Sequence, residues 1–459
     1  MNIALTLVVV GLLVFLAHVF AEIFSRKKIP DVLLLIGIGL VVGPILKIVS
    51  IDSFGAIGPV FSTITLVTIL FEGGTELKMD ALKHSVKGTL LLTNLNFFVT
   101  MIAVGLLGWG IFDLDPLVSL MLGSIVGGTS SAVVIPLVRQ LNLGKKSGTI
   151  LILESAFSDV LCIVFALAFL EAVEMGQLKV GIMIGNILAS FILATLIGLA
   201  GSFFWSLVLH KIRNIKNSIF TTPAFVFIIF GISELLGYSG AISSLAFGIG
   251  LANMELLASP AVQSIIAKRS DTLNETERVL FSEVVFLLKT FFFIYIGISI
   301  KLTDLLPLLI GFLITVVLFL FRIPIVRASM PLGSSNKRDL YFMSAIVPKG
   351  LAAAVLATIP LQRGIAGGEF IMNVTFAIVL FSIAFTSILI PLIDRMPAVQ
   401  KFYDKSLNLN KWIRVSIQKY QHNQERKKQA KSKLKTVDQQ ADESLADKAP
   451  EEDQIKKDE

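Results

Sequence analysis

Charged residues and cysteine are scarce in this sequence of 459 residues. Only 16% of the residues are charged, whereas roughly 25% is usual in a soluble globular domain. The single cysteine, Cys162, excludes an internal disulfide and a cluster of thiolate metal ligands. The alternating apolar and polar pattern of membrane barrel strands is also absent. These absences exclude an ordinary soluble domain and a disulfide-stabilised secreted scaffold.

Long apolar stretches are abundant instead, and 54% of the residues are hydrophobic. Most stretches are close to the roughly 20 residues that a helix needs to cross the hydrocarbon core. The first stretch lacks a basic start and a small-residue cleavage site, so we interpret it as a retained helix. We predict an all-α polytopic membrane protein with about thirteen transmembrane helices, at residues 2–24, 32–49, 56–74, 88–112, 117–138, 148–171, 180–209, 219–236, 241–253, 279–300, 305–326, 340–361 and 370–393.

Charges in the connecting loops predict the orientation of these spans, because cytoplasmic loops retain Lys and Arg. Alternate loops carry groups of basic residues, such as those at 26–28 and 139–146, whereas the other loops have only Lys47, Lys179, Lys301 and Arg363. This alternation predicts a cell-membrane protein with its N-terminus outside and its C-terminus in the cytoplasm. The net charge of +7 lies in loops and the tail, so it does not indicate a nucleic-acid partner.

The composition changes after the last span. Residues 396–459 are rich in charge and poor in apolar side chains, which predicts a cytoplasmic tail that is largely disordered. An alternative for residues 407–420, which include Trp412 and Ile413, is a short basic helix lying on the membrane.

Two carboxylates, Glu154 and Asp159, lie inside the apolar segment LILESAFSDVLCIVFALAFL. A charge inside the membrane is costly and needs a partner, a water-filled cavity or a protonated state. At about 1.5 Å per residue, Asp159 lies roughly 17 Å from the cytoplasmic end of its span and Lys289 roughly 15 Å from the end of its own. Glu154 and Arg322 are level with each other at a shallower depth.

Helical geometry separates the two carboxylates by about 140° around the axis, so each can face its own partner. We interpret Glu154 and Arg322 as a structural ion pair, because Arg stays charged at any accessible pH. For Asp159 a functional role is favoured over a structural one, since a midplane carboxylate can exchange a proton. For Lys289 a structural role and a role in proton coupling remain open.

Two spans are interrupted at the same depth. The span at 117–138 contains GGTSS, and the span at 340–361 contains Pro348, Lys349 and Gly350. Glycine and proline permit unwinding, and two antiparallel interrupted spans are typical of inverted repeats with discontinuous helices that bind ions. Ordinary kinks or small-residue packing faces are the alternative. We predict two discontinuous crossing helices, with Lys349 neutralising their facing carbonyl ends.

At these residues the sequence resembles the cation:proton antiporter superfamily, which includes bacterial and archaeal sodium/proton exchangers. The resemblance covers residues 2–395. Its carboxylate motif Glu-Ser-x-x-Asn-Asp corresponds to ESAFSD, which maps Glu154, Ser155 and Asp159, and Arg322 in LFLFRIP resembles the arginine partner of the glutamate. FEGGTEL, with Glu72, and PKGLAAAVLA resemble two further family segments.

The chain departs from the family pattern at three places. Ser158 replaces the asparagine, TSS replaces Thr-Asp-Pro in the first interruption, and Lys289 resembles a membrane lysine of another branch. The resemblance implies a homodimer, and it divides residues 1–395 into a dimerisation bundle and a six-helix core that moves like an elevator.

We therefore predict a secondary antiporter that exchanges a monovalent cation, Na⁺ first and otherwise K⁺ or Li⁺, for protons by competition at Asp159. Hard cations prefer oxygen ligands, and the candidates for cation binding or proton coupling beside Asp159 are Thr129, Ser130, Ser155 and Ser158. Glu72 either lines an access funnel or is an interfacial carboxylate. No cofactor is expected.

Two other interpretations are less favoured. A proton-coupled transporter of a small organic solute needs aromatic or arginine contacts at the midplane, but the interruptions carry small residues. An intramembrane aspartyl protease needs a second apposed aspartate, and we find none deep in any span. An enzyme is therefore not expected.

Overall fold

The computed structural model describes residues 8, 11–12, 14–19, 22, 31–49, 57–77, 79–176, 180–212, 220–254, 275–330 and 335–407. The regular elements of the described residues are all helices, with no strand among them. In the first half of the chain the elements are α2 (Asp31–Leu40), the π-helix η1 (Val41–Ile45), α3 (Ile57–Glu76), α4 (Met79–Gly110), α5 (Pro116–Ile125), α6 (Ser131–Gln140), α7 (Lys145–Met175) and α8 (Val180–Ile212). They continue with α9 (Thr221–Leu235), α10 (Gly240–Ala252), α13 (Glu275–Ser299), α14 (Leu305–Ser329), α15 (Lys337–Ala345), α16 (Leu351–Gln362), α17 (Gly368–Arg395) and α18 (Pro397–Ser406).

Each predicted span from the second to the thirteenth coincides with a described helix or with two helices that follow each other closely. Six described helices are long and apolar enough to cross a membrane, and seven apolar segments are shorter, at 10–17 residues. The predicted first span, 2–24, lies mostly outside the described residues, so the total of thirteen remains a prediction.

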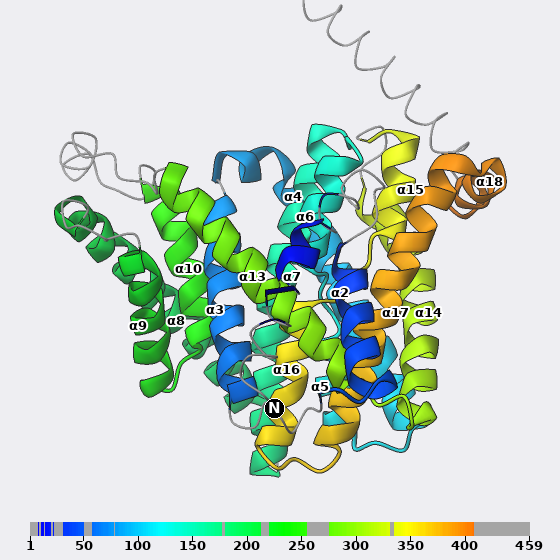
Figure 1. Ribbon diagram of the computed structural model, residues 1–459, viewed down its shortest axis with the longest axis horizontal. Helices are drawn as coiled ribbons and strands as arrows, with labels where there is room; N and C mark the ends of the chain where they lie inside the picture. The colour runs from blue at the N-terminus through cyan, green and yellow to red at the C-terminus, as the bar shows by residue number, and fades with distance from the viewer. Residues whose placement is uncertain are drawn as a thin grey trace, which may run out of the picture. The chain divides into compact units, whose positions relative to one another are not determined.

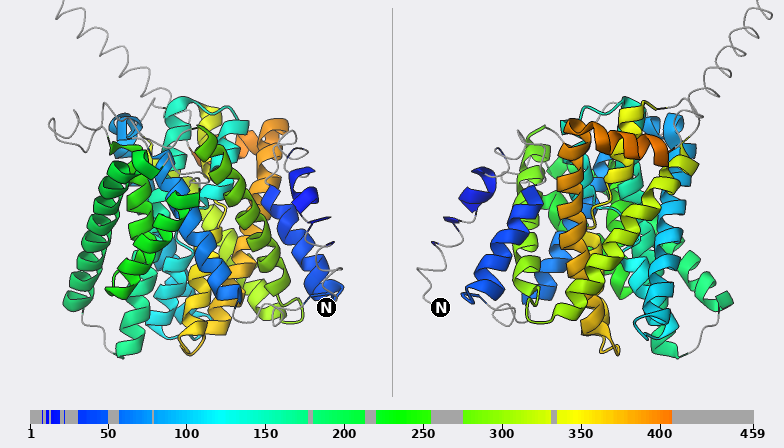
Figure 2. Two further views of the ribbon diagram at one scale, coloured as in Figure 1. Left: turned by 60° about the vertical axis from the view of Figure 1, so that its left-hand side comes forward. Right: turned by 90° about the vertical axis from the view of Figure 1, so that its right-hand side faces the viewer.

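The helices of the first compact unit, Met1–Met330 with Ser335–Leu407, pack into two bundles. We call α2, α3, α8, α9, α10 and α13 the first bundle, and α4 to α7 with α14 to α17 the second bundle. The main contacts that join the bundles are those of α7 with α8, α3 with α16, and α2 with α17. Figures 1 and 2 show the long helices running in a common direction, with α8 and α9 at one side and α14 and α17 at the other.

Both predicted interruptions are present in the second bundle. The first break, residues 126–130, separates α5 from α6, and the second break, residues 346–350, separates α15 from α16. The N-terminus of α5 is fixed by Asp115, whose Oδ1 accepts a hydrogen bond of 2.8 Å from the Leu117 N–H, with Pro116 at the first helical position. The breaks therefore lie within well-defined helices.

Order continues beyond the predicted boundary at residue 395. Helix α18 packs on α15 and α17, and its Tyr403 and the following Leu407 are buried. Asp404 accepts a 2.7 Å hydrogen bond from the Tyr341 hydroxyl on α15, and burial raises the pKa of Tyr403 to about 12. Residues 408–459, with most of the predicted tail and of the alternative surface helix at 407–420, lie outside the described residues.

Glycines let helices of the first bundle approach closely. A Cβ added at Gly39 on α2 would lie 2.2 Å from the carbonyl oxygen of Ile294 on α13, and one added at Gly297 would lie 2.2 Å from that of Ile36. Such separations are far below van der Waals contact. The α2–α13 crossing therefore requires residues without a side chain, as is common in membrane helix packing.

We expect Gly39→Ala to destabilise the protein by about 1–3 kcal/mol, because the added methyl group must push α13 away. The matched control is Gly37→Ala, two residues earlier on α2 and so on another face of the helix, where a Cβ would meet nothing within 4 Å. Thermal unfolding in detergent measures both variants. Equal melting temperatures for Gly39→Ala and Gly37→Ala would contradict the close crossing.

Candidate functional site

The two breaks contact each other directly. The backbone N–H of Ser130 in the first break donates to the carbonyl oxygen of Pro348 in the second break, at 2.8 Å. A Cβ added at Gly350 would lie 2.0 Å from the Ser130 Oγ, so this close approach requires glycine. The crossing joins the two discontinuous helices at the centre of the second bundle.

Asp159 lies on α7 beside the first break. Its Oδ2 accepts a hydrogen bond of 3.3 Å from the Ser131 hydroxyl at the start of α6, and the residue is half-buried. The Ser155 hydroxyl, one turn earlier, donates to the Ile152 carbonyl at 2.8 Å. Asp159 therefore keeps carboxylate lone pairs beyond the one used by Ser131, which a cation or a proton can occupy.

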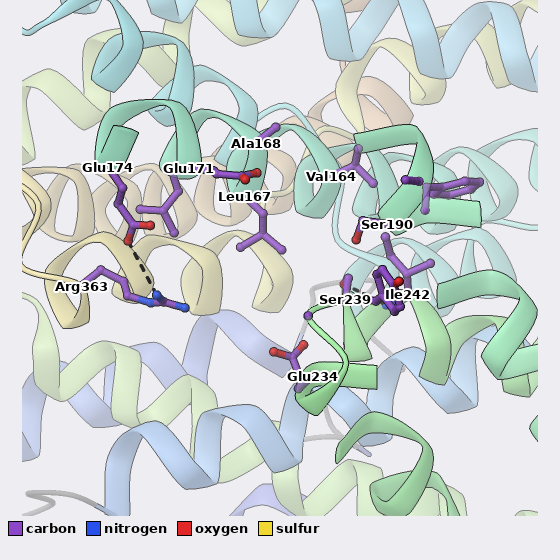
Figure 3. A pocket seen from close by; sticks show the side chains of 15 residues that line it. Val164, Leu167, Ala168, Glu171, Glu174, Ser190, Glu234, Ser239, Ile242 and Arg363 are labelled. Carbon is purple, nitrogen blue, oxygen red and sulfur yellow. Dashed lines mark hydrogen bonds and ion pairs between the residues drawn. The ribbon is translucent and has the colours of Figure 1, made fainter. Parts of the chain in front are cut away.

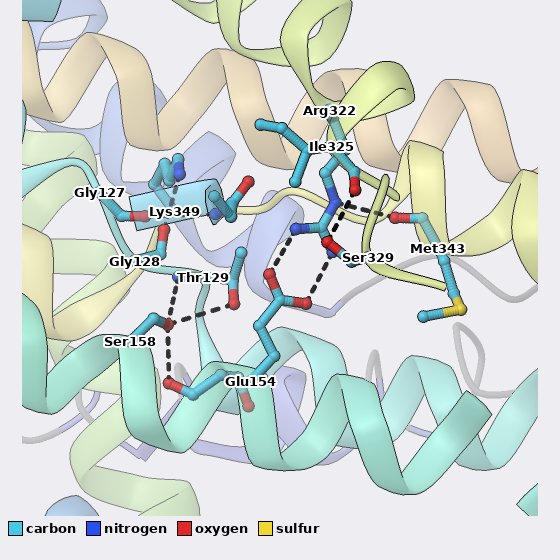
Figure 4. Close-up of polar contacts among 12 residues, drawn as sticks. Gly127, Gly128, Thr129, Glu154, Ser158, Arg322, Ile325, Ser329, Met343 and Lys349 are labelled. Atoms are coloured by element: carbon cyan, nitrogen blue, oxygen red, sulfur yellow. Dashed lines mark hydrogen bonds and ion pairs between the residues drawn. The ribbon is translucent and has the colours of Figure 1, made fainter. Parts of the chain in front are cut away.

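The candidate oxygen ligands of the first break differ in their contacts. The Ser158 Oγ on α7 accepts a 3.0 Å hydrogen bond from the Thr129 N–H and lies 3.5 Å from the Thr129 hydroxyl (Figure 4). Ser130 Oγ is buried and has no hydrogen-bond partner among the described residues. Ser158 holds the break in place, whereas Ser130 retains a free hydroxyl.

Lys349 in the second break reaches into the first break. Its Nζ is fully buried and donates to the Gly128 carbonyl oxygen at 2.7 Å (Figure 4). Its charge is attracted by Glu154 and Asp159 and repelled by Arg322. Two buried cations and two carboxylates thus form a cluster that is formally neutral when both carboxylates are ionised.

Glu154 and Arg322 form a two-pronged ion pair between α7 and α14. The Arg322 Nη1 donates to Glu154 Oε1, Nη2 donates to Oε2 at 2.7 Å, and Nε donates to the Met343 carbonyl oxygen on α15 at 3.0 Å (Figure 4). Both side chains are at most 1% exposed. The hydrogen bonds of Arg322 thus join α14 to both α7 and α15. The pair holds three helices of the second bundle together.

Lys289 and Glu72 belong to the first bundle, whereas Asp159 belongs to the second bundle. Lys289 is half-buried on α13, with its Nζ 5.7 Å from the centroid of the Phe286 ring, and α13 packs mainly against α2 and α3. Glu72 is half-buried on α3, also in the first bundle. Among the described residues, the buried Lys349 of the second break is a cation whose charge acts on Asp159.

A cavity of about 480 Å³ lies between the bundles at the end of α7 that is predicted to face outside (Figure 3). Glu171, Glu174 and Glu234 line it, and Arg363 lies 3.7 Å from Glu174. Glu234 accepts a hydrogen bond of 2.7 Å from the Gly240 N–H. Along α7, the lining residues Val164 and Glu171 lie roughly 8 Å and 18 Å from Asp159. Asp159 and the residues of the two breaks are not part of the lining.

Sequence reasoning missed several residues of the site. Ser131 donates to Asp159, and Asn96 on α4 donates to the Gly127 carbonyl oxygen at 3.3 Å. Ser382 on α17 accepts a hydrogen bond from the Lys349 N–H at 2.9 Å. Ser131 directly follows Thr129 and Ser130, and this position could have indicated its place in the site. The sequence gives no such indication for buried Asn and Ser residues on other helices.

Comparisons with known proteins point in one direction. Residues 10–395 match the family described as "Sodium/hydrogen exchanger, transmembrane". The K(+)/H(+) antiporter NhaP2 of Shewanella baltica (strain OS223) is 26% identical over 388 residues, which cover 81% of this chain and 63% of that protein. Na(+)/H(+) antiporter 1 of Methanocaldococcus jannaschii is 31% identical over 157 residues, covering 34% of this chain and 37% of that protein.

A solved structure shares the fold. The sodium proton antiporter MjNhaP1 from Methanocaldococcus jannaschii at pH 8 superposes with a TM-score of 0.69 and 22% identity, covering 86% of this chain and 98% of that chain. The chain spans less than two thirds of the length of the NhaP2 relatives. The matched family is one of transporters, which removes the protease interpretation. Because the family match extends over nearly all described helices, the chain belongs to the transmembrane sodium/hydrogen exchanger family.

Proposed function

We propose that the protein is a secondary antiporter that exchanges a monovalent cation for protons by competition at Asp159. The observation that carries the proposal is the half-buried Asp159 carboxylate beside two crossed helix breaks. A carboxylate in such a site carries either a cation or a proton in neutralised form. Occupancy by one excludes the other, and this exclusion couples the two flows.

The ligands proposed around Asp159 suit a small ion. The break supplies the free hydroxyl of Ser130, and Thr129 and Ser155 supply further oxygens. Arg322 and Lys349 already donate to protein acceptors. An organic solute would need polar side chains that are not already hydrogen-bonded to the protein. Transport of such a solute is therefore the second, less favoured proposal.

The cation is proposed to be Na⁺ first, with K⁺ and Li⁺ as alternatives, because relatives are named for both K⁺ and Na⁺. The test is a pH-gradient dequenching assay in proteoliposomes, with each cation added in turn. We expect a rapid collapse of the gradient with at least one of the three cations. No response to any of them, from protein shown to be folded and inserted, would overturn the proposal.

Alternating access is proposed to arise from movement of the second bundle against the first. Packing that is denser within each bundle than between them supports this division. Apolar side chains such as Leu196 on α8, Ile228 on α9 and Leu309 on α14 are exposed, which suits a lipid or partner-facing surface. We also propose a homodimer in the cell membrane, with the N-terminus outside.

We expect exchange to be electroneutral, with one proton for one cation, because Lys289 lies in the other bundle and Asp159 is the one carboxylate proposed to alternate between the two ions. Charge movement on a supported membrane, after a cation jump at symmetric pH, should show no steady current. Lys289→Gln should keep cation-dependent proton flux. A steady current in the unmodified protein that disappears in Lys289→Gln would refute this expectation and assign the second proton to the lysine.

A further inference from the structure

Serine hydroxyls hold the two breaks in the same way. In the first break, the Ser158 Oγ accepts from the Thr129 N–H at 3.0 Å and donates to the Ser155 carbonyl three residues earlier, at 3.1 Å. In the second break, the Ser382 Oγ accepts from the Lys349 N–H at 2.9 Å and donates to the Val379 carbonyl three residues earlier, at 3.1 Å.

The two serines also occupy matching places in the chain. Ser158 lies on α7, the helix that follows the first discontinuous pair, and Ser382 lies on α17, which follows the second pair. Both are fully buried. The repetition of donor, acceptor, spacing and burial argues against two unrelated contacts.

A physical need explains the motif. Interrupting a helix leaves backbone N–H groups without their helical acceptors, and a buried N–H without a partner is costly. A serine hydroxyl has one hydrogen to donate and lone pairs to accept with. When the hydroxyl hydrogen of Ser382 is bound to Val379, an oxygen lone pair is left directed at the Lys349 N–H.

Ser382 thereby influences a residue that reaches the first break. The Lys349 backbone is fixed by Ser382, and its side chain donates to Gly128, two residues from Ser130. Pro348, directly before Lys349, accepts from the Ser130 N–H. A shift of the second break would displace both of these hydrogen bonds to the first break. The oxygens of the first break beside Asp159 would then move as well.

We propose that Ser382 is a positioning residue of the transport site, matched to Ser158, which holds the second break so that Lys349 keeps the first break in its ion-binding form. Ser382 does not touch the ion. Its effect passes through Lys349 and Gly128 to the oxygens around Asp159. The proposal rests on the proposed antiport at Asp159.

The test compares Ser382→Ala with Ser382→Thr and with Ser387→Ala. Ser387 is a matched control, because it is buried on the same helix and, among the described residues, its hydroxyl donates only to Ile383 of its own helix. We expect Ser382→Ala to raise the apparent KM for the cation about tenfold, as is typical when an outer partner of a cation site is removed. The maximal rate should change far less, Ser382→Thr should restore the KM, and Ser387→Ala should match the unmodified protein.

Two further measurements keep the test decisive. If Ser382→Ala does not fold, Ser382→Cys replaces it, because a thiol of similar size is only a weak acceptor and should also raise the KM. Amide hydrogen exchange of the 346–350 segment does not depend on transport and should rise in Ser382→Ala but not in Ser387→Ala. A KM equal to that of Ser387→Ala, or unchanged exchange at Lys349, would overturn the proposal, whereas absence of transport in the unmodified protein would overturn only the proposed antiport.

Discussion

Asp159→Asn is expected to reduce cation-dependent proton flux to the level of protein-free liposomes while leaving the protein folded. The amide keeps the shape of the side chain and can still accept the Ser131 hydrogen bond. It cannot bind and release a proton, and it lacks the charge that a cation neutralises. Without alternation between the two loads, the two flows are no longer coupled.

The control for this variant is Asp304→Asn. Asp304 is an exposed carboxylate directly before α14, and its side chain does not cap that helix. Proteoliposomes with Asp304→Asn should exchange at the normal rate, and both variants should elute as the unmodified protein does in size-exclusion chromatography. Normal exchange by folded Asp159→Asn would show that another group carries the ions.

The second large effect concerns Glu154 and Arg322, which are expected to act as one unit in stability. Replacing either alone, by Glu154→Leu or Arg322→Met, should lower the free energy of unfolding by about 3 kcal/mol or more, because the surviving charge stays buried and unpaired. The double variant should recover part of this loss. The recovery should be incomplete, since the Met343 carbonyl oxygen also loses its donor, the Arg322 Nε.

The measurement is a double-mutant cycle by equilibrium unfolding in detergent micelles. The exposed pair Lys301 and Glu369 serves as a control, because its side chains are 48% and 58% exposed. Exposed pairs contribute at most about 1 kcal/mol, so its coupling energy should be much smaller. If the Glu154/Arg322 double variant is no more stable than the less stable single variant, the two residues do not act as one unit.

Local chemistry allowed much of the fold to be predicted from the sequence. Helix positions follow from apolar length, and the two breaks follow from runs such as Gly127 to Ser131 and from Pro348 with Gly350. Both signals are local, because hydrophobic length and the conformational freedom of glycine or restriction of proline act within a few residues. Depth along the helices also predicts the contact of Glu154 with Arg322, which the structure contains.

The same depth argument did not identify the cation beside Asp159. The predicted depths of Asp159 and Lys289 are level, yet the two residues lie in different bundles. The charge of Lys349, from the second break, acts on the carboxylate. Depth along the membrane normal is only one of three coordinates. Residue spacing gives the angle between two side chains on one helix, but it does not say which neighbouring helix each side chain faces.

The sequence by itself determined the membrane class, the helices of the described spans, the two breaks and the buried carboxylates on α7. Only the tertiary structure decided which groups meet there: Ser131 with Asp159, Lys349 with Gly128, and Ser382 with the Lys349 backbone. The physical reason is the separation along the chain of the residues that interact. Helix formation and breakage depend on neighbouring residues, whereas a hydrogen bond between helices depends on packing that brings atoms from distant parts of the chain within about 3 Å.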